Sequence, residues 1–289
     1  MQTKQPNPSP TDHSGGIPGV SRILAIASGK GGVGKTTVSV NLALALAQTG
    51  AQVGLFDADL YGPNVPLMLG VQRSKPAQGY MPIARASREP YIPPLERFGL
   101  KVMSVGLLVA SQETVLADPR IAGAIIRQTL QDVRWGALDY LLVDLPPGSG
   151  EPQQTLLSTI KIDGALLVTT PQDLSLMDAS RSIGLFDSAG VPILGVVENM
   201  SYLTCPHCGE PVEVFHRSKR AWAIEERQIE LLGRIPMNIS ISRGIDEGHP
   251  FMDSAGSTVE KAPFVEIAEK IKKKLEIDRG RLVWSPSRG

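Results

Sequence analysis

Residues 28–37 read Ser-Gly-Lys-Gly-Gly-Val-Gly-Lys-Thr-Thr, and this stretch decides the fold. A short apolar run at 22–27 precedes it, and an Ala- and Leu-rich stretch of helical length follows at 36–48. Strand, glycine loop and helix are the arrangement that a phosphate-binding loop requires, so the context favours such a loop over a glycine-rich turn without a ligand. The pattern G-x-x-x-x-G-K-[ST] is completed by Gly29, Gly34, Lys35 and Thr36.

The chemistry of the loop follows from its residue types. Glycines let successive backbone N–H groups turn toward one anion, and the start of the next helix adds a favourable dipole. We expect Lys35 to reach the β- and γ-phosphates of a nucleotide and the Thr36 hydroxyl to ligate Mg²⁺. The residues predicted to contact the nucleotide are Gly29, Lys30, Gly31, Gly32, Val33, Gly34, Lys35, Thr36 and Thr37.

The composition excludes several classes of protein. The chain has 289 residues with 29 basic and 29 acidic side chains, so bulk charge does not favour nucleic acid or an anionic membrane as a partner. It contains no run of about 18 apolar residues, so we expect no transmembrane helix. Residues 1–19 are polar and rich in Pro, Gly and Ser, which predicts a disordered tail without a signal or transit peptide. We therefore expect a cytoplasmic protein with reduced thiols.

Apolar strand-like runs alternate with helix-length segments along most of the chain. Because the runs are continuous rather than alternating, they suit a parallel sheet buried on both faces, and the fold class predicted is a doubly wound α/β phosphate-loop domain over 20–278. Residues 72–97 are rich in Pro and predict a surface excursion, and 279–289 a loose tail. The predicted strands are 22–27, 52–56, 100–104, 140–143, 164–169, 193–197 and 231–235. The predicted helices are 36–48, 121–135, 153–160, 176–188 and 259–275.

Two aspartates follow the second predicted strand, in Phe56-Asp57-Ala58-Asp59. Carboxylates just beyond the carboxyl end of a strand lie where ligands bind in open α/β sheets. We expect one of them to orient the attacking water and one to lie near Mg²⁺, with Asp59 and Asp57 both open to either role on this evidence. Aspartates that only cap a turn are the structural alternative.

A second strand ends in an acid, in Leu142-Val143-Asp144-Leu145-Pro146-Pro147-Gly148. Apolar residues followed by Asp fit the second carboxylate on the metal side of phosphate-loop enzymes, which acts through a water. Gly148 is predicted to place its backbone N–H against the γ-phosphate, as a switch that senses hydrolysis.

The two cysteines of the chain, Cys205 and Cys208, lie in one C-x-x-C turn. Both thiolates of such a turn can point at one metal centre, whereas a structural disulfide is disfavoured in a reducing compartment. Iron–sulfur clusters and structural Zn²⁺ usually take four ligands, so the simplest completion is the same pair from a second copy. His207 lies between the two and is interpreted as an exposed spacer. A zinc knuckle and a redox dithiol remain alternatives.

Lys30, directly after the first glycine, makes the loop resemble the deviant phosphate loop of the MinD/ParA/ArsA ATPases. In that group the extra lysine reaches across a dimer to the partner's ATP. Taken with the aspartate segments, Thr170-Pro171-Gln172, Glu198-Asn199-Met200-Ser201 and the cysteine turn, the chain resembles the Mrp/ApbC family of iron–sulfur cluster carrier ATPases over about 23–252.

The resemblance implies ATP binding with slow hydrolysis, a homodimer, and a labile [4Fe–4S] cluster that bridges two subunits. It implies a scaffold as cluster donor and apo iron–sulfur proteins as recipients. It favours Asp59 for the water, leaves Asp57 nearer the metal, and gives Lys30 and Lys35 catalytic roles. It also implies that Asn199 contacts adenine together with the Pro236 region.

Two rival functions make different demands on the sequence. A MinD/ParA-like positioning ATPase with a structural zinc knuckle would need a membrane-binding or DNA-binding surface, for which the lysine-rich segment 264–275 is the candidate. Its apolar positions recur at helical spacing, so we expect that stripe to pack on the domain. An ATP-driven electron donor like nitrogenase reductase would take its cluster ligands from separated loops, whereas these cysteines share one.

Overall fold

The computed structural model describes residues 16–60, 62–71, 92–107, 119–205, 207–215, 228–254 and 257–282. Its strands are β1 (Val20–Ala27), β2 (Val53–Asp57), β3 (Leu95–Arg97), β4 (Leu100–Ser104), β5 (Leu138–Asp144), β6 (Gly164–Thr169), β7 (Ile193–Glu198), β8 (Leu203–Thr204), β9 (Pro211–Val212) and β10 (Leu231–Arg234). Its α-helices are α1 (Lys35–Gln48), α2 (Val65–Met68), α4 (Pro119–Asp132), α5 (Glu151–Thr159), α6 (Asp173–Ser188), α8 (Ile239–Glu247) and α9 (Thr258–Leu282).

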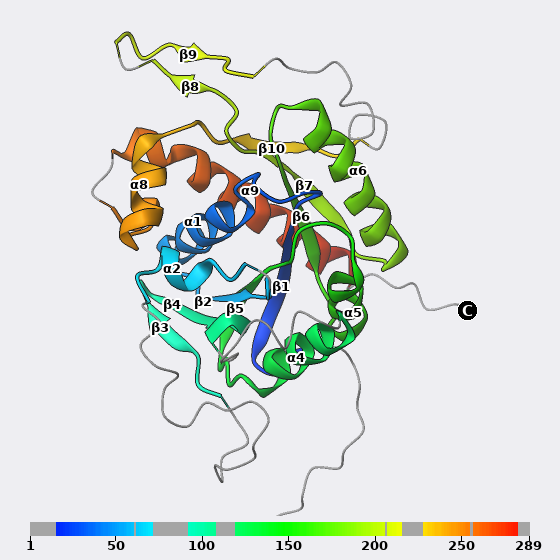
Figure 1. The fold of residues 1–289 in the computed structure, drawn as a ribbon. Coiled ribbons are helices and arrows are strands. Elements are labelled where there is room, and N and C mark those ends of the chain that lie inside the picture. The colour runs from blue at the N-terminus through cyan, green and yellow to red at the C-terminus, as the bar shows by residue number, and fades with distance from the viewer. Residues whose placement is uncertain are drawn as a thin grey trace, which may run out of the picture.

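Eight of the described strands form one sheet in the order β10-β7-β6-β1-β5-β2-β4-β3. Neighbouring strands are parallel except for β3, which pairs antiparallel with β4 at one edge. Helices cover both faces of the sheet, with α1, α2, α8 and α9 on one side and α4, α5 and α6 on the other (Figure 1). The predicted doubly wound, mostly parallel α/β fold is confirmed.

Each face of the sheet has its own apolar core. One contains Trp135 and Phe186 together with residues of α4 and α5, and the other joins α1 and α9 to the opposite face of the strands. The central strands are buried on both faces, which is why their sequences read as continuous apolar runs. The predicted tail over 1–19 includes Ile17, but this residue is buried in the first core.

The bounds of most predicted elements agree with the observed ones to within a few residues, and the C-terminal end of α9 is the largest difference. The strands at 100–104 and 164–169 have the predicted bounds, while β1 begins two residues earlier than predicted. The excursion at 72–97 ends in the short strand β3, and α9 continues through 279–282, which was predicted to be loose tail. The predicted disorder of residues 1–15, and the predicted structure of 72–91 and 283–289, lie outside the described residues.

The position of helix α9 shows whether the apolar stripe of 264–275 packs on the domain or is free to bind a membrane. Its stripe of Phe264, Ile267, Ile271 and Leu275 is buried against the domain, as the helical spacing predicted. Among the described residues, no helix combines the length and apolar character needed to cross a membrane.

The strand register places Asp57 and Asp144 side by side at one edge of the sheet. Asp144, the last residue of β5, is the partner of Ile26 on β1 and of Asp57, the last residue of β2. The phosphate loop begins directly after β1, so both carboxylates lie at the edge of the sheet where ligands bind in this class of fold.

Candidate functional site

The phosphate loop runs from β1 into α1, and its geometry is set by glycines. Gly32 and Gly34 have φ of 80° and 79°, in the left-handed region that favours glycine. The Ser28 hydroxyl donates to the Lys30 carbonyl at 2.9 Å, and Val38 N–H donates to the Gly34 carbonyl at 3.0 Å. The first twelve residues of α1 are buried, so the helix N-terminus that faces the loop is held firmly by the core.

Open space surrounds three glycines of the site. A Cβ built on Gly31, Gly32 or Gly148 would meet no protein atom within 4 Å. At Gly34, in contrast, a Cβ would lie 2.2 Å from Nδ2 of Asn199. Space beside these glycines is therefore open, and the N–H groups of the loop and the Lys35 ammonium are chemically suited to bind a phosphate group.

Asp144 binds the basic and hydroxyl groups of the loop. Lys35 Nζ lies 2.7 Å from Asp144 Oδ1, and the Thr36 hydroxyl donates to Oδ2 at 2.7 Å. Asp144 is fully buried, and the Lys35 side chain is only 6% exposed. Thr36 and Asp144 lie together as a hydroxyl and a carboxylate, the oxygen donor types that Mg²⁺ prefers, so these residues fit the predicted magnesium site.

Ser39 is a site residue that the sequence analysis missed. It is fully buried, and its hydroxyl lies 2.6 Å from Asp144 Oδ1 and 3.0 Å from the Lys35 carbonyl. A hydroxyl has one proton to donate, so the shorter contact to the carboxylate takes it. The signal was available, because Ser39 follows Lys35 by four residues and therefore lies on the same face of α1.

Asp57 is buried without any exposed surface. Its Oδ2 accepts hydrogen bonds from the Ser104 hydroxyl at 2.9 Å and from Val65 N–H at 3.3 Å, and its Oδ1 accepts from Asp59 N–H at 3.1 Å. Burial, followed by the negative charge of Asp144, raises the pKa of Asp57 from its ordinary value to about 8. At neutral pH this carboxyl therefore keeps a proton that an exposed aspartate would lose.

Asp59 lies in the turn after β2. Its Oδ1 accepts a hydrogen bond from Gly62 N–H at 3.2 Å, and its side chain is 8% exposed. Both aspartates thus form the local turn contacts that the structural alternative predicted. Asp59 differs from Asp57 in retaining some access to solvent, which a residue that orients a water requires.

The segment after Asp144 carries Gly148, whose φ is 90°. Its N–H donates to the Ser28 carbonyl at 3.1 Å, at the start of the phosphate loop. The Gln153 side-chain amide donates to the Pro146 carbonyl, and Gln153 Oε1 is buried without a hydrogen-bond partner. The predicted switch segment is therefore tied to the phosphate loop at one point and to α5 at another.

Asn199 follows β7 and is nearly buried. Its amide Nδ2 donates to the Val33 carbonyl of the phosphate loop at 2.9 Å. Ser201 N–H donates to the Ile235 carbonyl at 2.9 Å, which places the Pro236 segment beside this turn. The structure therefore brings Asn199 and the Pro236 region together near the loop.

Cys205 and Cys208 lie on the turn of a hairpin formed by β8 and β9, which projects from the body of the domain (Figure 1). Both are free thiols; Cys205 is half-buried and Cys208 is exposed. Backbone N–H groups of Cys208 and then of His207 donate to the Cys205 sulfur and lower its pKa, which favours the thiolate. Within the described part of the chain, no group of three or more metal-ligating side chains comes together.

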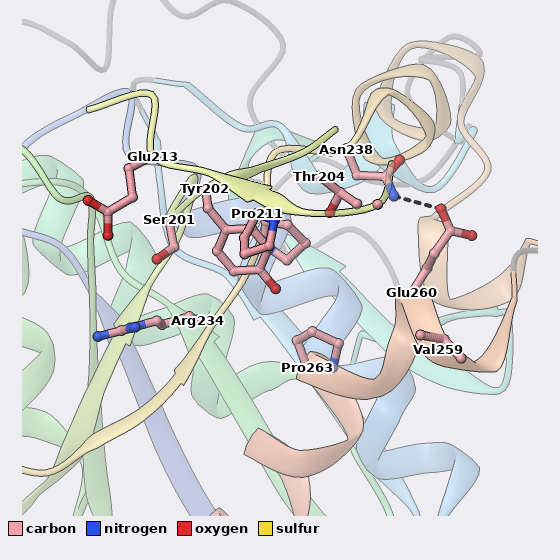
Figure 2. Close-up of a pocket in the computed structure, with 12 residues that line it drawn as sticks. Ser201, Tyr202, Thr204, Pro211, Glu213, Arg234, Asn238, Val259, Glu260 and Pro263 are labelled. Carbon is pink, nitrogen blue, oxygen red and sulfur yellow. Dashed lines mark hydrogen bonds between the residues drawn. The ribbon is translucent and has the colours of Figure 1, made fainter. Parts of the chain in front are cut away.

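A cavity of about 550 Å³ lies between the cysteine hairpin and the start of α9. Figure 2 shows Thr204 and Pro211 of the hairpin on one side and Pro263 of α9 on the other, with Tyr202 between them. Pro236 also lines it. Asn238 caps α8 by accepting from Ser240 N–H at 2.7 Å, and its amide donates to Glu260 at 3.0 Å, closing one end.

The fold and the loop define a phosphate-loop NTPase. Residues 19–272 match the family described as ParA, NUBPL iron-transfer P-loop NTPase. This chain belongs to that family, which confirms the predicted relationship to iron–sulfur cluster carrier ATPases of the MinD/ParA-like group.

The similar proteins span bacteria, archaea and plants. The chain is 43% identical to the iron–sulfur cluster carrier protein of Methanocaldococcus jannaschii over 88% of this chain and 86% of that one. It is 40% identical to the iron–sulfur cluster carrier protein of Escherichia coli, over 89% of this chain and 67% of that one. It is also 42% identical, over 89% and 80%, to an Arabidopsis thaliana protein named as an iron–sulfur protein required for NADH dehydrogenase, mitochondrial.

Solved structures agree on the fold. A nucleotide-binding protein from Archaeoglobus fulgidus in complex with ADP has a TM-score of 0.67 and 33% identity, over 82% of this chain and 90% of that one. The cell division ATPase MinD of Pyrococcus furiosus has a TM-score of 0.64 and 31% identity, over 88% and 99%.

Proposed function

We propose that this chain is an ATPase that carries an iron–sulfur cluster as a homodimer and delivers it to apoproteins. The observation that carries the proposal is that one chain combines a pair of free thiols on a projecting hairpin with a complete phosphate loop. Two thiolates supply half of the ligands that a [4Fe–4S] cluster takes, so a second copy of the hairpin would complete the site.

The loop residues have distinct roles in the proposed hydrolysis. Lys35 would leave Asp144 to bind the β- and γ-phosphates, and Thr36 and Asp144 would hold Mg²⁺, which would neutralise charge on the phosphates. Asp59 orients the attacking water. Lys30 of the partner subunit neutralises charge on the transferring phosphoryl group, which is worth most in the transition state.

The remaining predicted residues bind the nucleotide or sense it. Gly148 N–H would leave the Ser28 carbonyl to reach the γ-phosphate, with Asp57 buried behind the metal. Asn199 and Pro236 would contact adenine.

Closure of the dimer on ATP would then move the segment 144–148 and change how firmly the hairpin holds its cluster. Equal rates of cluster transfer from cluster-loaded wild type and Lys35→Ala would refute this coupling.

The cluster is the cargo of this cycle, received from a scaffold and passed to apo iron–sulfur proteins. Thiols must remain reduced for that purpose, which the cytoplasm ensures, and the lowered pKa of Cys205 favours ligation at neutral pH. Neither nucleic acid nor a membrane is needed as a partner.

Anaerobic reconstitution with iron and sulfide tests the proposal. Wild type is expected to take up about four irons and four sulfides per dimer and to sediment as a dimer, whereas Cys205→Ser and Cys208→Ser lose both properties. Thr204→Ser, one residue from Cys205, is the matched control and should behave as wild type. Uptake of zinc alone, without sulfide, would overturn the cluster assignment.

That outcome would favour the second candidate, a MinD-like positioning ATPase with a zinc knuckle. The structural likeness to MinD supports it. The buried apolar stripe of α9 argues against it, because this stripe is not available to bind a membrane.

A further inference from the structure

The turn that begins at Asn199 leads along the chain into the cysteine hairpin and is hydrogen-bonded to the phosphate loop. Asn199 donates its side-chain amide to the Val33 carbonyl, and six residues later the chain reaches Cys205. The backbone of the turn is held at both ends, since Asn199 N–H donates to the Thr169 carbonyl at 2.8 Å and Ser201 N–H to Ile235. Val33 of the phosphate loop is therefore in direct contact with the segment that leads to the thiols.

The contact at Val33 is sensitive to an anion in the loop. The Val33 carbonyl and the Gly34 N–H belong to one rigid peptide plane. Phosphate drawn to that N–H tilts the plane, and the carbonyl that Asn199 holds tilts with it. The fit is close, because a Cβ on Gly34 would lie 2.2 Å from the Asn199 amide and 3.6 Å from Met200 Cε.

Met200 shows that the turn is under strain. Its φ is 53°, a left-handed conformation that a methionine rarely adopts. Such a conformation persists where surrounding bonds over-determine it. The Asn199 side-chain bond to Val33 is one bond whose loss would release it.

Beyond Met200 the turn is bonded to the hairpin. Met237 N–H donates to the Tyr202 carbonyl at 2.7 Å, and Leu203 of β8 bridges to Met237. Cys205 then closes the hairpin, with its N–H donating to the Glu210 carbonyl at 2.9 Å. The path from the loop to the thiols thus begins with the Asn199 side chain at Val33 and continues through backbone contacts to Cys205.

We propose that Asn199 is a positioning residue that couples nucleotide in the phosphate loop to the presentation of Cys205 and Cys208. The inference deepens the proposed function and rests on it for the nucleotide and for the use of the thiols. Thermodynamic linkage makes such a coupling reciprocal. The factor by which nucleotide changes the affinity of the thiols for a metal equals the factor by which that metal changes the affinity for nucleotide.

The test uses the full-length, metal-free, reduced protein and the rate at which an aromatic disulfide reagent modifies its thiols. Saturating Mg·ADP is expected to change this rate in wild type by about fivefold or more. In Asn199→Ala, with ADP saturation verified by titration, the change should fall to about 1.5-fold or less. Asn238→Ala is the matched control, since it removes an amide beside the hairpin that does not touch the loop, and it should respond as wild type does.

Two further outcomes decide the inference. If Asn199 serves only the base, Asn199→Ala binds ADP more weakly but shows the full thiol response at saturation, which overturns the coupling; no nucleotide response in wild type overturns it as well. Should Asn199→Ala fail to fold, Asn199→Asp keeps the size and removes the donor, with the same loss expected. A protein that bound Mg·ADP but took up no cluster would refute the proposed function and leave this test intact.

Discussion

Asp57 and Asp144 are register partners on the adjacent strands β2 and β5, and both side chains are fully buried. Lys35 pairs with Asp144 at 2.7 Å, while Asp57 accepts hydrogen bonds from Ser104 and from backbone N–H groups. Two neighbouring buried carboxylates are costly to ionise together, so one of them keeps its proton. Asp57, with a pKa raised to about 8, is that residue.

The first prediction concerns stability against pH. Between the ordinary aspartate pKa of 3.8 and about 8, the unfolded chain loses the Asp57 proton and the folded protein keeps it. Stability contributed by this group is therefore greatest at low pH and falls as the pH rises through that window. From pH 5 to pH 7, the free energy of unfolding of wild type should fall more than that of Asp57→Asn, by up to about 3 kcal/mol.

Urea unfolding at the two pH values measures this difference. Asp139→Asn is the control, since Asp139 is an exposed aspartate that accepts a backbone hydrogen bond from Gln52, and its pH dependence should follow that of wild type. Parallel pH profiles for wild type and Asp57→Asn would mean that Asp57 is ionised in the folded protein.

The second prediction concerns the ion pair of Lys35 and Asp144. Removing either partner leaves the other charge buried, so Lys35→Met and Asp144→Asn should each cost about 3–5 kcal/mol of stability. The double variant is neutral at this point, so it should cost less than the sum, with a coupling energy of about 1–3 kcal/mol.

A double-mutant cycle by chemical denaturation gives this coupling energy. The exposed pair of Lys272 and Glu269 serves as the comparison, tested as Lys272→Met and Glu269→Gln. It should show a coupling of about 0.5 kcal/mol or less. Equal coupling energies for the two pairs would show that burial adds nothing to the Lys35 contact.

The third prediction separates backbone strain from close packing. Gly34 and Gly50 both have positive φ, at 79° and 86°, so alanine is strained at each by about 1–2 kcal/mol. Only at Gly34 would the new methyl group also meet the Asn199 amide, while the space at Gly50 is open. Gly34→Ala should therefore cost about 1–3 kcal/mol more than Gly50→Ala and should lose Mg·ADP binding.

Thermal unfolding and ADP titration of the two variants check this difference. Gly50→Ala should retain the nucleotide affinity of wild type, because it lies at the far end of α1. Equal costs for the two substitutions would indicate that the Asn199 side chain moves away from Gly34 easily, which would weaken its proposed role as a link.

The sequence predicted well those elements that have a long apolar run or follow a specific motif. Continuous apolar runs located the central strands, and the phosphate-loop motif placed α1 to within one residue. The hairpin of β8 and β9 was not predicted, since strands of two residues carry no periodic signal. Helix α8 was also missed, although Asn238 and Gly248 cap its two ends in the usual way.

In the site, too, the residues of a motif were predicted and those brought together only by the fold were not. The motif predicted Lys35 and Thr36, because these side chains are required by the phosphate chemistry itself. Ser104 was not predicted, because it meets Asp57 only through the pairing of β2 with β4, which a single sequence does not reveal. Asn199 was predicted for adenine by resemblance, and its contact with Val33 depends on tertiary packing.

The last prediction tests whether Lys30 acts across the dimer. Lys30→Ala and Asp59→Asn are each expected to lose most ATPase activity, one by losing the lysine for the partner's ATP and the other by losing the residue that orients water. Mixed, they form heterodimers in which the Lys30→Ala subunit keeps its own Asp59 and receives Lys30 from the partner. That active site is complete, so random association should restore about one quarter of wild-type activity.

If Lys30 instead acted within its own subunit, every site of the mixture would lack one of the two residues and no activity would return. The control is a mixture of Lys35→Ala with Lys30→Ala/Asp59→Asn. Each site then lacks a residue of its own subunit, whichever way Lys30 acts, and the mixture should remain inactive. Phosphate release at equal total protein concentration distinguishes the outcomes, since only action across the interface makes two inactive variants complement each other.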